Sequence, residues 1–265
     1  MVATMSLAVL AAMTGVMLCA WAYGLARHNG GWTDVFWTFG SGMTLALAAL
    51  FPPAQGGAPS ARQWLVAGLV ALWALRLGTY LAPRVASHPE DPRYARFRQE
   101  WGNDYARNML FVTLPQAPAT ALLAISVLVA AHAPGAALTL RDVLGVAVLL
   151  MALGGEATAD AQMKLFKAQQ ANRGKVADVG LWGWSRHPNY FFQWLGWLAY
   201  PVIAFDPARP FTWLSLTAAA VMFLLLTRVS GVPPLEAAQL RSKGEAYRRY
   251  QQRVSAFFPL PPKSS

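Results

Sequence analysis

Four ionisable side chains share one face of a predicted helix inside an otherwise apolar stretch. They are spaced by four, four and three positions, as Glu156, Asp160, Lys164 and Lys167. This spacing stacks side chains on one helix face. The acids lie deep in the apolar run and the bases near its end. Because ionisable groups inside a bilayer are costly, the stripe indicates a site for a polar ligand, with a structural bond from Glu156 to a neighbouring helix as the alternative.

A second group of polar residues precedes another apolar run, in the stretch 180–190, which reads GLWGWSRHPNY. Pro188 suits the first turn of a helix and Ser185 can cap it. The free N–H groups and positive dipole end, beside Arg186 and His187, would bind an anion. An ordinary interfacial role for His187 stays open. Two amides four residues apart would continue the same face: Asn189 and Gln193.

A third group places a tyrosine between two cations at spacings of four, as Arg76, Tyr80 and Arg84. A Tyr O–H in an apolar pocket can donate to a substrate carbonyl, although core packing of Tyr80 is the alternative. Asp34 could assist it or lie at the membrane interface. Glu236 could reach back to a basic loop residue or remain a solvated acid.

These residues belong to a chain that the composition assigns to the membrane. Of 265 residues, 55% are hydrophobic and only 13% charged, against about one-quarter charged in an average soluble domain. The sequence predicts an all-α polytopic integral membrane protein, a single membrane domain over 1–265, with a Pro/Gly-rich external loop at 52–62 and a cytoplasmic amphipathic C-terminal helix over 233–255. Seven apolar runs can each cross a bilayer, six spans being the alternative count: 2–26, 32–52, 63–83, 109–132, 142–163, 188–206 and 211–231.

The basic residues predict the orientation. Seven spans place only Arg62, Arg141 and Arg209 on one side, and nearly all other loop Lys and Arg residues on the opposite side. The positive-inside rule then puts the N-terminus outside and the C-terminus in the cytoplasm, across the inner membrane if the source is bacterial. Orientation and anionic headgroups explain the net charge of +10 without a nucleic-acid partner.

Familiar signatures of other site classes are missing from the sequence. Neither a G-x-G-x-x-G fingerprint after a strand nor a P-loop occurs, so neither a Rossmann site nor a P-loop site is indicated. The four histidines are scattered without zinc-ligand spacing, and no metal site is predicted.

Several stretches together resemble the steroid 5-alpha-reductase family. The resemblance is closest to its bacterial branch, catalogued as a domain of unknown function, and covers most of the chain from about Asp34 onward. The stretch 185–190, SRHPNY, also occurs in sterol reductases and isoprenylcysteine carboxyl methyltransferases, so it does not fix the reaction. The matching stretches include the Glu156–Lys164 stripe, Asn172-Arg173-Gly174, 180–190, 228–236 and 75–80.

The resemblance implies seven helices that bind NADPH in the C-terminal half, at about 140–262. Tyr80 matches the family tyrosine that hydrogen-bonds the substrate carbonyl. Asp34 is a possible substitute for the glutamate that partners this tyrosine in eukaryotic members, and Gln193 replaces a later glutamate. The residues that would line the cofactor are Glu156, Asp160, Lys164, Lys167, Arg173, Lys175, Arg186, Asn189 and Glu236.

The resulting hypothesis is an NADPH-dependent oxidoreductase that reduces the carbon–carbon double bond of an enone in a lipophilic substrate, such as a 3-oxo-Δ4-steroid. Tyr80, oriented by Asp34 or Arg76, would stabilise the carbonyl oxygen. The protein would work as a monomer among membrane lipids. The basic cluster favours NADPH over the nearest alternative, an S-adenosylmethionine-dependent methyltransferase. A non-enzymatic lipid-binding or transport protein is the third possibility.

Overall fold

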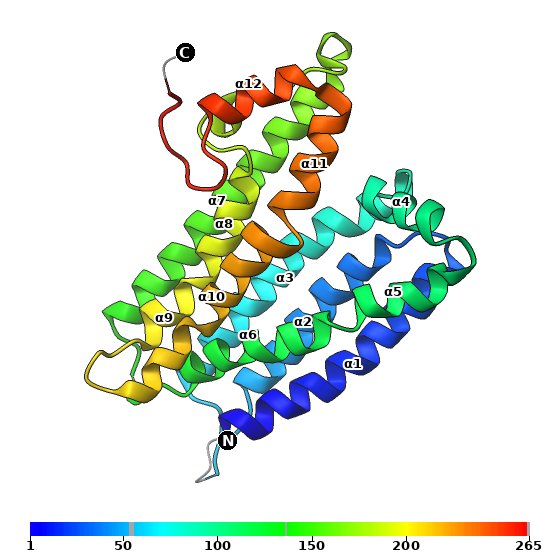
Figure 1. The fold of residues 1–265 in the computed structure, drawn as a ribbon. Coiled ribbons are helices and arrows are strands. Elements are labelled where there is room, and N and C mark those ends of the chain that lie inside the picture. Colours follow the sequence, from blue (N-terminus) through cyan, green and yellow to red (C-terminus); the bar gives the residue numbers. More distant parts are fainter. Residues whose placement is uncertain (53–55, 136, 264–265) are drawn as a thin grey trace. The chain divides into compact units, whose positions relative to one another are not determined.

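The computed structural model describes residues 1–52, 56–135 and 137–263, and most of them are helical (Figure 1). Residues 53–55 of the predicted external loop lie outside these ranges. The described residues form no β-strand and one isolated bridge, between Ser185 and Ser255. The predicted all-α class is therefore confirmed.

The α-helices follow one another along the chain as α1 (Val2–Ala26), α2 (Trp32–Ala49), α3 (Ala61–Ser87), α4 (Pro92–Trp101), α5 (Tyr105–Thr113), α6 (Gln116–Ala131), α7 (Leu140–Ala168), α8 (Pro188–Trp197), α9 (Ala199–Ala204), α10 (Thr217–Leu224), α11 (Val232–Lys243) and α12 (Glu245–Arg253). The shorter turns are η1 (Gly102–Asp104), η2 (Gln170–Asn172), η3 (Gly180–Gly183), η4 (Pro210–Leu216) and the π turn η5 (Leu225–Val229).

Five helical stretches of the described chain are long and apolar enough to cross a membrane. The predicted spans 32–52 and 188–206 do not reach this standard. The first forms α2, which carries Asp34 among several Thr and Ser residues, and the second forms the short helices α8 and α9. A multi-pass membrane protein is thus supported, while seven spans remain a prediction. The five stretches are Val2–Ala26, Ala61–Ser87, Pro92–Ala131, Leu140–Ala168 and Pro210–Lys243.

The contacts divide the chain into two compact units. Unit 1 comprises Met1–Val143 and Tyr200–Ala218, and unit 2 comprises Leu144–Ala199 and Ala219–Ser265. The predicted C-terminal half, about 140–262, overlaps largely with unit 2.

In unit 1, α2 packs on α1 and α3, and α6 packs on α1 (Figure 1). Small residues let the helices come close. A Cβ at Gly42 would lie 2.2 Å from the Cβ of Ala74, and one at Gly78 would lie 2.3 Å from the Phe39 ring. Close approach through small residues is the usual means of packing helices in a membrane, where the hydrophobic effect does not drive their association.

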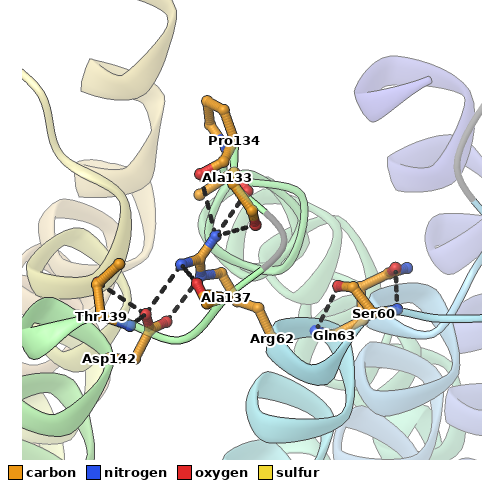
Figure 2. Close-up of polar contacts among 9 residues, drawn as sticks. Ser60, Arg62, Gln63, Ala133, Pro134, Ala137, Thr139 and Asp142 are labelled. Atoms are coloured by element: carbon orange, nitrogen blue, oxygen red, sulfur yellow. Dashed lines mark hydrogen bonds and ion pairs between the residues drawn. The ribbon is translucent and has the colours of Figure 1, made fainter.

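A buried ion pair joins the beginnings of α3 and α7 within unit 1 (Figure 2). Arg62 and Asp142 are 3% and 1% exposed. Arg62 Nε donates to Asp142 Oδ1 at 2.8 Å and Nη2 donates to Oδ2 at 2.9 Å. This pair was not predicted from the sequence. The remaining guanidinium hydrogens bind carbonyl oxygens of the loop before α7, those of Ala133, Pro134, Gly135 and Ala137.

In unit 2, α8 packs against the long helix α7. A Cβ at Gly155 would lie 2.3 Å from the Phe192 ring, so only glycine fits there. The predicted single helix over 233–255 is wrong in one respect, because it is broken into α11 and α12. Gly244 at the break has a φ of +52°, a conformation that glycine adopts at little cost and that ends a helix.

Candidate functional site

A charged cluster of unit 2 joins the residues before α8 to α11. Arg186 Nε donates to Glu236 Oε1 at 2.6 Å. His187 Nε2 lies 3.3 Å from the same oxygen, and Gln251 Nε2 donates to Glu236 Oε2 at 2.8 Å. Glu236 is therefore paired with a basic residue, which is one of the two roles that the sequence predicts for it. The carboxylate thus connects α11 to the residues before α8 and to α12.

The turn before α11 sets the position of Glu236. A Cβ at Gly231 would lie 2.3 Å from the carbonyl oxygen of Leu226. The N–H groups of Ser230 and Gly231 both donate to the Leu225 carbonyl, which closes the π turn η5. Since only glycine leaves room for this tight turn, it fixes where α11 begins and where Glu236 points.

Arg186 also anchors the end of the chain. Its Nη1 donates to the carbonyls of Gln251 and Val254, and its backbone N–H donates to Ser255. Ser185 Oγ donates to the carbonyl of Phe257. The motif at 185–190 thus holds the segment after α12. The sequence predicts contact of Arg186 with a phosphate and gives no sign of this anchoring, because Arg186 and Val254 lie 68 positions apart.

His187 is buried, and its ring stacks on that of Tyr190 at 5.6 Å between centroids. Ser185 Oγ accepts from the N–H of His187 at 3.1 Å. The sequence predicts that Ser185 caps this helix. In the structure the N-cap residue of α8 is His187, and its side chain makes no capping hydrogen bond. Pro188 occupies the first turn as predicted.

The stripe on α7 forms on a continuous helix, as its spacing predicted. Glu156 and Asp160 are 5% and 7% exposed, whereas Lys164 and Lys167 are exposed. One face of α7 therefore changes from buried acids to exposed bases within three turns. On α8, Gln193 is buried and Asn189 is half-buried.

Arg173 and Lys175 lie just after η2 and are exposed. Lys175 lines a cleft beside α12, which contains two buried tyrosines. Burial raises the pKa of Tyr247 and of Tyr250 above the usual value. Tyr250 stays a neutral hydroxyl at physiological pH and donates to the carbonyl of Trp182.

In unit 1, Arg76 and Tyr80 lie on α3, both half-buried. The Arg76 guanidinium carbon is 5.6 Å from the centroid of the Tyr80 ring, within the range of a cation–π contact. The structure thus brings together two of the three residues predicted to act on the substrate carbonyl.

Asp34, the third of these residues, has its hydrogen bonds with α4. Its Oδ1 accepts from the Tyr94 hydroxyl at 3.0 Å and its Oδ2 accepts from Arg93 Nη2 at 3.3 Å. Asp91 accepts from Arg93 as well. Burial alone would raise the pKa of Asp91, but the charge and hydrogen bonds of Arg93 outweigh it and hold this pKa below its usual range. Tyr94 was not among the predicted site residues, although acids and an arginine precede it in the sequence.

Metal chemistry receives no support from side-chain clustering. Within the described ranges, no group of three or more His, Cys, Asp or Glu residues is arranged to hold a metal ion.

An all-helical chain with several membrane-crossing stretches and acids buried on α7 defines a class, the multi-pass membrane proteins. A family model described as a protein of unknown function (DUF1295) matches residues 20–254. The chain belongs to this family. No curated protein and no solved structure matches it.

Proposed function

We propose that this protein is a membrane-embedded, NADPH-dependent reductase of the steroid 5-alpha-reductase type. It transfers a hydride to the β-carbon of an enone in a lipophilic substrate, in the most specific form a 3-oxo-Δ4-steroid. The observation that supports this proposal most is the change from buried acids to exposed bases along α7.

The donor set of unit 2 fits NADPH in its chemistry. Buried carboxylates of Glu156 and Asp160 can accept hydrogen bonds from ribose hydroxyls or the carboxamide. Exposed cations suit phosphates. Two of them, Lys164 and Lys167, end the stripe, and Arg173 follows it along the chain. Along α7 the acids are buried and the bases are exposed. This order matches a ligand that places a polar group inside the protein and its phosphates at the surface.

Arg186, His187 and Glu236 enter the proposal in a changed role. Their side chains bind one another and the end of the chain. We assign to them the placement of the first turn of α8, so that Asn189 and Gln193 face the cofactor. Nε and Nη1 of Arg186 already donate within the protein. Direct contact of Arg186 with a phosphate would therefore need another donor, such as Nη2.

Bound NADPH would supply the hydride. The Tyr80 hydroxyl would donate a hydrogen bond to the carbonyl oxygen, where negative charge develops as the β-carbon accepts the hydride. Arg76, stacked over the Tyr80 ring, would stabilise the same charge. The α-carbon then takes a proton from solvent, and the product is the saturated ketone.

The proposal includes seven spans, with the N-terminus outside and the C-terminus in the cytoplasm. This orientation exposes the bases at the end of α7 to the compartment that contains NADPH. The substrate would reach the protein from the bilayer.

A second candidate is an S-adenosylmethionine-dependent methyltransferase. It is favoured by one observation, that the Arg186 guanidinium already donates to Glu236, Gln251 and Val254. A cofactor without phosphates would not need this side chain.

The test is an assay of the detergent-purified protein with NADPH and a Δ4-3-ketosteroid or a simpler lipophilic enone. NADPH oxidation should be matched, mole for mole, by a product heavier by two hydrogens in mass spectrometry. Methyl transfer from S-adenosylmethionine to a lipid, with no NADPH oxidation on any enone, would contradict the reductase proposal.

A further inference from the structure

Unit 2 contains a cleft of about 750 Å³ between the segment after η2, α12 and the end of the chain. This volume lies within the usual range for small-molecule sites. Val176 and Tyr250 give it an apolar part, and four cations line it with a single acid. These charged residues are Lys175, Arg249, Arg253, Lys263 and Asp178.

The charges of the cleft do not cancel. Asp178 is paired with Arg253. Lys175, Arg249 and Lys263 form no ion pair with any residue in the part of the chain that the structure describes. Three like charges that converge from three separate segments repel one another, and a bound anion would relieve that repulsion.

The walls of the cleft are held by contacts of their own. Tyr250 is buried and donates to the carbonyl of Trp182, and Tyr250 packs with Tyr247 and Val254. The backbone N–H of Lys263 donates to the carbonyl of Arg253 at 2.9 Å. The cations are therefore displayed on an ordered frame, which lowers the entropic cost of binding a ligand.

The positive-inside bias does not by itself predict this arrangement. That bias requires cations on one side of the membrane, and it places no condition on whether they converge. Arg248, the neighbour of Arg249 on α12, does not line the cleft. Its Nη1 lies 3.8 Å from Glu245 Oε2. The convergence is specific to one face of α12.

We propose that this cleft binds a phosphate group, as a phosphate monoester or diphosphate, which belongs either to a soluble nucleotide or to an anionic lipid headgroup. Arginine and lysine side chains are the usual partners of such groups. The inference does not depend on the proposed reductase activity, and it shares only Lys175 with the residues assigned to NADPH.

The test uses the full-length protein and two phosphate probes. In detergent, inorganic pyrophosphate is titrated by calorimetry into the wild type, Arg249→Gln, Lys263→Gln and the control Arg248→Gln. In nanodiscs of phosphatidylcholine with or without phosphatidic acid, the lipid that co-purifies is quantified. Arg248, Arg249 and Lys263 are all exposed, so none of the three substitutions should impair folding.

Pyrophosphate affinity should fall about tenfold in Arg249→Gln and in Lys263→Gln, and stay within about twofold of wild type in Arg248→Gln. That result supports a soluble source. Enrichment of phosphatidic acid that the two cleft variants lose, without pyrophosphate binding, supports a lipid source. Binding of neither probe, or an equal loss in Arg248→Gln, would overturn the inference. NADPH binding by a variant in which Lys164 and Lys167, both outside the cleft, are replaced by glutamine reports on the reductase proposal.

Discussion

Tyr80 and Tyr94 differ in what their side chains contact, although each lies beside an arginine. Tyr94 is 4% exposed, and its hydroxyl donates to Asp34. Tyr80 is half-buried under the guanidinium of Arg76. The hydroxyl of Tyr94 therefore has a structural task. Tyr80 stays the predicted donor to a substrate carbonyl because it matches the family tyrosine with that role.

Replacing Tyr80 by phenylalanine should lower the turnover number for enone reduction by about 10²-fold, the usual cost of losing one donor to a developing oxyanion. The dissociation constant of NADPH should stay within about twofold. Steady-state kinetics and a binding titration measure the two quantities. Tyr94→Phe is the matched control and should lower the melting temperature with a smaller effect on turnover. Equal turnover in Tyr80→Phe and wild type would exclude Tyr80 from catalysis.

Arg186 is predicted to contribute both to stability and, in the family reading, to cofactor binding. Arg186→Ala removes the partner of Glu236 and the clamp on Gln251 and Val254. We expect a lower melting temperature and about tenfold weaker NADPH binding. Arg186→Lys keeps the charge without the guanidinium fork, so it should restore part of the affinity but little of the stability.

Thermal unfolding and an NADPH titration on the same preparations separate these contributions. A destabilised Arg186→Ala variant with an unchanged NADPH dissociation constant would leave the residue as a clamp on the chain, without a part in cofactor binding.

At the scale of elements, the strongest polar tie in unit 1 is the pair that joins α3 and α7. Arg62 and Asp142 are 80 positions apart in the sequence and almost completely buried. Breaking a buried pair leaves an uncompensated charge, which costs about 3–5 kcal/mol. Arg62→Ala and Asp142→Asn should each lower the melting temperature in detergent.

The double variant is expected to be no less stable than the worse single variant, since the two side chains act together. Simple addition of the two losses would contradict a direct interaction.

The sequence predicts where most elements form better than it predicts their contacts. Helices α1, α3 and α7 occupy predicted runs. Pro115 is the N-cap residue of α6 and Pro118 lies in its first turn, where a missing N–H group removes no helical hydrogen bond. The stripe on α7 follows from helical spacing alone. The pairs Arg62–Asp142, Asp34–Tyr94 and Arg186–Glu236 could not be predicted, because each joins distant segments whose approach depends on packing.

The break between α11 and α12 shows another limit of periodicity. Leucines and tyrosines among charges predicted a single helix over 233–255. Gly244 interrupts it without disturbing the pattern on either side. A glycine within an amphipathic run was the available signal for this break.

At the scale of the whole molecule, the distribution of cations predicts an orientation that can be tested directly. A fluorescent protein fused after Ser265 should fold and fluoresce in intact cells, while alkaline phosphatase at the same place should stay inactive, because the C-terminus is predicted to be cytoplasmic. Fusions at the N-terminus should give the reverse pattern. A cytoplasmic N-terminus would contradict the seven-span topology.

Membership of a family of unknown function leaves the cofactor as the central question. The most direct measurement is equilibrium dialysis of the detergent-purified, full-length protein against NADPH and, separately, against S-adenosylmethionine. The proposed function predicts saturable binding of NADPH that weakens when Lys164 and Lys167 are both replaced by glutamine, and no saturable binding of S-adenosylmethionine. Saturable binding of S-adenosylmethionine without binding of NADPH would contradict it.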